Sequence, residues 1–158
     1  MAILTVGVGS GFDYASLADA IAASRDGDVI KVQAGTYTND FATISTSITI
    51  EGVGGMVNLV ATEPPPNQKG ILTIGAGGVT GPEVTIDNVS FSGAAIPNDA
   101  GGNAAGIRYQ SGNLVLNNCS FFDNQNGLLA DADPGGAITI NRSEFASNGN
   151  ADPPPSGV

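Results

Sequence analysis

Histidine and tryptophan are missing from this chain of 158 residues, and cysteine occurs only once. Without histidine there is no His-based general base, no nucleophile relay and no ordinary set of zinc ligands. A single cysteine excludes an internal disulfide. Cys119 stands where the sequence requires a small apolar residue, which indicates a buried, inert thiol rather than a nucleophile.

Positive charge is also scarce. Lysine and arginine together number 5 against 15 acidic residues, which gives a net charge of -10. A nucleic-acid-binding protein needs a basic face to neutralise phosphates, so we expect no nucleic-acid partner. The same charge would repel an anionic membrane surface and attract divalent cations, calcium above all. Solubility through self-repulsion is the alternative explanation of the charge.

Long hydrophobic runs are absent as well. No segment contains the roughly 20 apolar residues that a membrane-spanning helix needs. The N-terminus, MAILTVGVGSG, has neither the basic start nor the apolar run of a Sec signal peptide. We therefore expect no membrane span. The location stays open at this point between the cytoplasm and export by a route without an N-terminal signal peptide.

The chain is rich instead in glycine, asparagine, aspartate, serine and threonine, which separate short apolar segments. Short strands bounded by such residues predict an all-β fold with many tight turns. The beginning differs, because Ser16 and Asp19 form a capping box around an apolar stripe that contains Leu17 and Ile21. We expect a short helix there, ending near Gly27.

These segments are expected to form a single domain over residues 1–158. Residues 1–27 supply an N-terminal strand and a capping helix, and residues 28–158 supply repeated coils. Two stretches, 62–70 and 94–106, interrupt the regular spacing of short strands and are predicted to be insertions between coils. The candidate strands are Val29–Val32, Ala42–Ile44, Ile48–Ile50, Val57–Val60, Ile71–Ile74, Val84–Ile86, Ile107–Tyr109, Leu114–Leu116, Leu128–Ala130 and Ala137–Ile140.

The strongest signal is an internal repeat. The segments VTIDNVSF (84–91), LVLNNCSF (114–121) and ITINRSEF (138–145) align without gaps, and their starts lie 30 and 24 residues apart. Each has apolar residues at its first and third positions, a polar bend at the fourth and fifth, and phenylalanine at the eighth. Alternation directs the first and third side chains to the same side, so stacked copies predict aliphatic columns. A phenylalanine column is predicted from Phe91, Phe121 and Phe145.

Polar residues recur at the corners of this repeat. Asp87, Asn117 and Asn141 are equivalent, and Asn124 and Asn148 form a second equivalent pair. Asparagine tolerates the left-handed conformation at a tight bend, and stacked amides can hydrogen-bond along a column. Parallel coils about 4.8 Å apart would bring these side chains together. Helical repeats need a period of 3.6, and an antiparallel sandwich would not reproduce polar corners at a fixed offset.

The opening FDYASLADAIAASRDGDVIKVQAGTYT, followed by ITIEGVGG, resembles the start of pectate-lyase-like right-handed parallel β-helix proteins. In that superfamily a short helix caps the first coil, and a strand of the pattern GD-x-I-x-V-x-x-G-x-Y begins the stack. The later GIRYQ…NLVLNNCSFFDNQNGLLA is similar to their recurring coil. The resemblance implies an all-β right-handed parallel β-helix, a solenoid of about six coils with a short N-terminal capping helix and an uncapped C-terminal end.

This resemblance is specific for fold and not for activity. The superfamily includes lyases, hydrolases, esterases, epimerases, adhesins and structural modules. The chain also resembles the β-helix regions of bacterial exoproteins that leave the cell by type I secretion. Those regions lack N-terminal signals and are acidic, rich in asparagine and nearly free of cysteine, as this chain is. This resemblance implies an extracellular or cell-surface location, reached without an N-terminal signal peptide, with a cytoplasmic location as the alternative.

Polysaccharide lyases of the superfamily use a calcium-binding cluster of carboxylates, with arginine or lysine as the base. The matching candidates are Asp131 and Asp133 in LLADADPGG as calcium ligands and Arg108 in GIRYQ as the base. The alignment of coils places Arg108 and Asp131 on one face. The alternative is that residues 131–136 form an ordinary turn at the end of a strand. Calcium is the one cofactor that these residues suggest.

The ends of the chain lead to two functional hypotheses. The last coil is expected to show unpaired backbone and apolar side chains, because Gly157 and Val158 stand where another coil would begin. The first hypothesis is a non-enzymatic extracellular module, structural or adhesive, that self-associates through this open end as a filament or a dimer. It would bind acidic polysaccharide through calcium. The second is a truncated fragment of a polysaccharide-active enzyme, of lyase or epimerase type, whose missing C-terminal coils complete the site.

Overall fold

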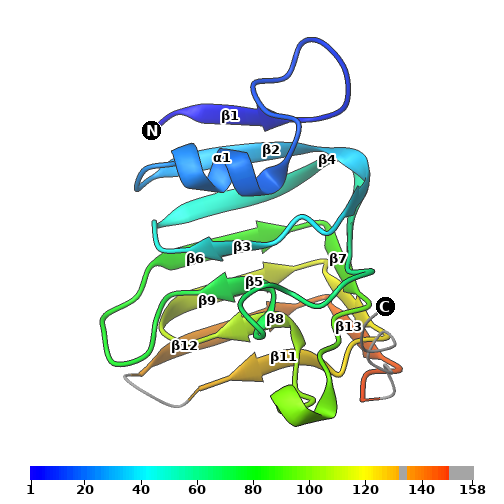
Figure 1. The fold of residues 1–158 in the computed structure, drawn as a ribbon. Helices are drawn as coiled ribbons and strands as arrows, with labels where there is room; N and C mark the ends of the chain where they lie inside the picture. Colours follow the sequence, from blue (N-terminus) through cyan, green and yellow to red (C-terminus); the bar gives the residue numbers. More distant parts are fainter. Residues whose placement is uncertain (132–134, 150–158) are drawn as a thin grey trace.

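The structure is a computed structural model that describes residues 1–131 and 135–149. The fold is mostly β, with parallel strands in two sheets, and α1 (Leu17–Ala23) is the one α-helix in this part of the chain. Figure 1 shows β1 and α1 at one end of the stack and β11 and β12 at the other. The strands are β1 (Ile3–Val6), β2 (Asp28–Thr38), β3 (Ala42–Ile44), β4 (Ile48–Val60), β5 (Gly70–Ile74), β6 (Glu83–Asp87), β7 (Val89–Ser92), β8 (Ala105–Tyr109), β9 (Gly112–Asn117), β10 (Ser120–Phe122), β11 (Asn126–Ala130), β12 (Gly136–Asn141) and β13 (Glu144–Ala146).

The strand pairs form three stacks, in which each turn of the chain lies in register on the turn before. The first stack runs from β1 through the beginnings of β2 and β4 to β6, β9 and β12. The second runs from the ends of β2 and β4 to β7, β10 and β13. The third contains β3, β5, β8 and β11. Long-range parallel pairing therefore organises the whole described chain.

The columns expected from the repeat are confirmed. Ile86 pairs with Leu116, and Leu116 pairs with Ile140. The rings of Phe91 and Phe121 stack with centroids 4.9 Å apart, and those of Phe121 and Phe145 stack at 4.5 Å. Stacked rings in consecutive turns therefore continue the apolar core along the second stack.

The predicted polar columns are confirmed as well. Asn117 donates an amide hydrogen bond to Asp87, and Asn141 donates one to Asn117 at 2.8 Å. Asn124 donates to the side-chain oxygen of Asn148 at 3.1 Å. Each amide thus satisfies a neighbour one turn away, as buried or partly buried polar groups require.

Three strands were not predicted as strands, namely β7, β10 and β13. Each begins just after a polar corner, and its candidate segment in the sequence was taken to end there. Asn88, Asn118 and Arg142 hold left-handed backbone conformations at these corners, with φ of 59°, 51° and 46°. One left-handed residue turns the chain sharply enough for a new strand to start at once. The candidates Ile48–Ile50 and Val57–Val60 are likewise the two halves of β4.

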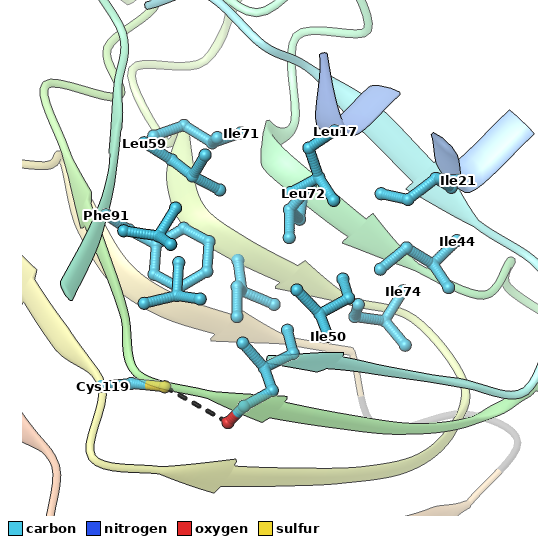
Figure 2. Close-up of a cluster of buried hydrophobic side chains, with 14 of the residues drawn as sticks. Leu17, Ile21, Ile44, Ile50, Leu59, Ile71, Leu72, Ile74, Phe91 and Cys119 are labelled. Atoms are coloured by element: carbon cyan, nitrogen blue, oxygen red, sulfur yellow. Dashed lines mark hydrogen bonds between the residues drawn. The ribbon is translucent and has the colours of Figure 1, made fainter. Parts of the chain in front are cut away.

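The core lies between the three stacks and under α1. Figure 2 shows Leu17 and Ile21 of α1 pointing toward Ile44 and Leu72 of the third stack. All four are buried, with at most 5% of their surface exposed. Close packing also explains a glycine: a Cβ atom at Gly106 would lie 2.9 Å from the Cβ of Phe91, so no larger residue fits.

The helix begins as predicted and ends earlier than predicted. Ser16 accepts a hydrogen bond from the backbone N–H of Asp19 at 3.1 Å. The helix ends at Ala23, where the hydroxyl of Ser24 donates to the carbonyl of Ile21 at 2.7 Å. Gly27 is left-handed, with φ of 88°, and lies in the turn into β2. The serine side chain satisfies the end of the helix, so a glycine cap is not needed.

The two stretches proposed as insertions, 62–70 and 94–106, overlap residues 61–69 and 93–104, which contain no strand. Residue 70 already belongs to β5 and residues 105 and 106 to β8, and the second stretch carries the 3-10 helix η1 (Asn98–Ala100). Gln125 fixes this second stretch, because its side chain accepts from the N–H groups of Ile96 and Ala104 and donates to the carbonyl of Ile96. No helix in the described residues is long and apolar enough to cross a membrane.

Candidate functional site

Arg108 and Asp131 meet at the surface of the third stack. Arg108 lies on β8, and Asp131 directly follows β11, the next strand of that stack. Their Nη2 and Oδ1 atoms are 3.0 Å apart and form an ion pair. Gln110 donates from its amide to the other carboxylate oxygen of Asp131 at 3.3 Å. The structure thus brings together two of the three residues singled out from the sequence.

The charges of Arg108 and Asp131 neutralise each other, so neither needs a bound substrate as a partner. Asp131 receives a donor on each of its oxygens, and the side chains of Arg108 and Asp131 are 17% and 37% exposed. Gln110 directly follows β8 and stands two residues after Arg108, so alternation places both on the same side, which is the signal that could have identified Gln110. The Nε atom of Arg108 is buried and has no hydrogen-bond partner among the described residues.

The predicted calcium site is only partly visible. Asp131 is engaged by Arg108 and Gln110, and Asp133 lies outside the described residues. Within residues 1–131 and 135–149, no three side chains of His, Cys, Asp or Glu are grouped so that they could hold a metal ion. Calcium binding therefore stays a prediction.

Cys119 is the buried thiol expected from the repeat. Only 1% of its surface is exposed, and its thiol lies 3.4 Å from the carbonyl oxygen of Ile86 (Figure 2). Burial raises the pKa of Cys119 to about 11, because the thiolate would lose its hydration. A thiol held in this state is a poor nucleophile at neutral pH.

A polar groove of about 340 Å³ lies over the outer face of the first stack. Hydroxyl groups of Ser47, Thr49 and Thr85 line it, together with Asn113 and Glu83. Such groups can hydrogen-bond to sugar hydroxyls. None of the lining residues is aromatic, so a sugar ring would find no stacking surface there.

The last described turn forms a surface of a different kind, which we call the C-terminal end face. It consists of β11, β12 and β13, each of which pairs with a strand on one side only among the described residues. Leu128 and Ile138 are partly buried there, whereas Ile140 and Phe145 are exposed. Unpaired strand edges with apolar side chains are sites at which another β-strand can add.

Equivalent positions of the repeat show how strongly this face departs from the turn before it. Ile140 is 45% exposed, whereas its partner Leu116 is 0% exposed. Phe145 is 43% exposed, whereas Phe121 is 0% exposed. The residues are of the same kind in both turns, so the difference comes from what covers them.

No protein-family model matches this chain, and neither a curated protein nor a solved structure matches it. The function is therefore argued from the geometry of the described residues.

Proposed function

We propose that the chain is a right-handed parallel β-helix of about six coils that acts as a non-enzymatic, extracellular structural module and self-associates through the C-terminal end face. The in-register parallel stacks support the β-helix. Crossover connections between parallel strands of one sheet are right-handed in about 98% of cases, which supports the handedness. The acidic, nearly cysteine-free composition and the resemblance to exoprotein β-helix regions support the location.

The observation that carries the self-association is the exposure of Ile140 and Phe145, whose equivalents one turn earlier are fully buried. Complete burial of such a side chain contributes roughly 1.5–3 kcal/mol. About half of that contribution remains available at each of the two positions. A second β-edge would also satisfy the unpaired backbone groups of β11, β12 and β13.

Sedimentation velocity of the wild-type chain over a wide concentration range tests the proposal. We expect reversible association that Ile140→Lys abolishes, because a lysine on an open edge opposes strand addition. Val53→Lys is the matched control: Val53 is also exposed, at 47%, but lies in the middle of β4, away from the C-terminal end face. A strictly monomeric wild type at all concentrations would overturn the proposal.

A polysaccharide-active enzyme is the second candidate, and the contact between Arg108 and Asp131 is the observation in its favour. Pectate and alginate are incubated with the chain and calcium, and unsaturated products are measured by their absorbance. We expect no product. Product that Arg108→Ala abolishes, and that Arg25→Ala leaves unchanged, would replace the structural proposal with this one.

A further inference from the structure

The two ends of the stack are covered differently. At the N-terminal end, α1 places Leu17 and Ile21 over the core, and both are buried. The helix packs against β3, the first strand of the third stack. A strand that approached the third stack from this side would meet a helix instead of a strand edge, whereas β1 of the first stack pairs with β2 alone among the described strands. Head-to-tail stacking would therefore place β11, the last strand of the third stack, against α1.

The C-terminal end face carries little charge, although the chain as a whole has a net charge of -10. β11 and β12 contain no charged residue, and β13 contains one, Glu144. Two copies of an acidic chain repel each other, and the repulsion is smallest where the facing strands are neutral. The strands of this face therefore add little repulsion to the approach of a second copy.

Opposite charges appear at one corner of this face, where the sequence departs from its own repeat. Asn88 and Asn118 occupy the left-handed corner in two earlier turns, and Arg142 takes their place in the last described turn. In the strands that follow the corner, Ser90 of β7 and Ser120 of β10 lie in register with Glu144 of β13. Both Arg142 and Glu144 are exposed. Neither forms an ion pair with another residue in the described part of the chain.

A two-fold axis makes this pair self-complementary. In a symmetric dimer residue i contacts residue j of the partner and j contacts i. An axis that passes the corner at Ser143, between Arg142 and Glu144, brings each arginine opposite the other copy's glutamate. It also lays β12 of one copy antiparallel to β13 of the other, with Ile140 of one near Phe145 of the other.

We propose that the C-terminal end face binds a second copy of this chain end to end about such a two-fold axis, with Arg142 of each copy paired to Glu144 of the other. This geometry rests on the self-association proposed above and specifies its symmetry. It gives a closed dimer, since the face of each copy is used up in the contact. A head-to-tail arrangement would leave one face open and grow into a filament.

Charge reversal at the corner tests the geometry. Arg142→Glu leaves two negative charges at each corner, and Glu144→Arg leaves two positive charges. We expect each variant alone to dimerise at least tenfold more weakly than the wild type in sedimentation equilibrium, because like charges would face each other across the axis. An equimolar mixture of the two variants should form heterodimers of near wild-type affinity, and the double variant Arg142→Glu/Glu144→Arg should dimerise as the wild type does.

Arg25→Glu, a reversal near the opposite end, is the control and should leave dimerisation unchanged. Circular dichroism of all variants confirms that they fold, since both corner residues are exposed. Species that grow beyond the dimer, or single variants that dimerise as well as the wild type, would overturn the two-fold geometry and leave self-association standing. A wild type that stays monomeric would overturn both.

Discussion

The first turn and the last described turn of this molecule deal with the same physical problem in different ways. Every turn must cover the apolar side chains of the turn beside it. At the N-terminal end α1 covers those of the third stack, and the buried carboxylate of Asp40 holds the helix by accepting from the N–H groups of Leu17 and Ala18. At the other end Ile140 and Phe145 remain exposed. Covering an end therefore depends on local residues and is not a property of the repeat.

The largest expected loss of stability is in the phenylalanine column, where a buried ring and an exposed ring can be compared directly. Phe121→Ala removes a ring that is fully buried between Phe91 and Phe145, and should lower the free energy of unfolding by about 3–5 kcal/mol. Phe145→Ala removes the ring at the exposed end of the same column and should cost about half as much or less. Urea denaturation at a concentration at which the chain is monomeric measures both. Equal costs would mean that the two turns are equally covered.

A smaller effect is expected at the covered end. Asp40→Ala leaves two N–H groups at the start of α1 without an acceptor and should cost about 1–3 kcal/mol. Asp19→Ala is the matched control, because Asp19 is exposed on the same helix and should cost a few tenths of a kcal/mol. Urea denaturation gives the totals, and hydrogen exchange of the α1 amides shows whether the loss is local. Similar costs for both variants would contradict the role given to Asp40.

The smallest effect depends on pH. Asp28 accepts from the N–H groups of Ala2 and Arg25, and these bonds lower the pKa of Asp28 from 3.8. A carboxylate with a lowered pKa stabilises the folded state above its unfolded pKa, and this contribution disappears as the pH falls through its folded pKa. The wild type should therefore melt above Asp28→Asn at neutral pH, and the gap should close below about pH 3.8. A gap that does not change with pH would contradict this assignment.

The sequence predicted most of the stacking and the polar columns, but not the strands that begin after the corners. The repeat aligned the segments ending at Phe91, Phe121 and Phe145 correctly, because a gapless alignment of alternating residues determines which side chains share a column. It missed β7, β10 and β13, because a single left-handed residue is too short a break to recognise. The contacts of Asp40 with α1 were also missed, since they join residues more than 20 positions apart.

Of the candidate sites, the sequence predicted the contact between Arg108 and Asp131, but not which side chains are exposed at the C-terminal end face. The pairing of Ile107 with Leu128 follows from the Gly-Ile and Gly-Leu starts of their coils, and it brings Arg108 near Asp131. The exposure of Phe145 against the burial of Phe121 is invisible in a repeat that gives both positions the same residue. Only the neighbouring turn distinguishes them. The sequence shows that Arg142 and Glu144 depart from the repeat. Only the structure shows that both lie exposed at the same corner, which is what suggests a contact with a second copy.

The column of Asp87, Asn117 and Asn141 gives the stack a chemical direction. Each asparagine uses its amide N–H to donate toward the N-terminal end, and the column terminates on a carboxylate that only accepts. Asp87 thereby sets the orientation of every amide after it, because a flipped Asn117 would turn its oxygen toward the carboxylate. An asparagine at position 87 would remove that preference and allow the side-chain amides to reverse together. One residue that only accepts thus acts as the reference from which the rest of the column takes its polarity.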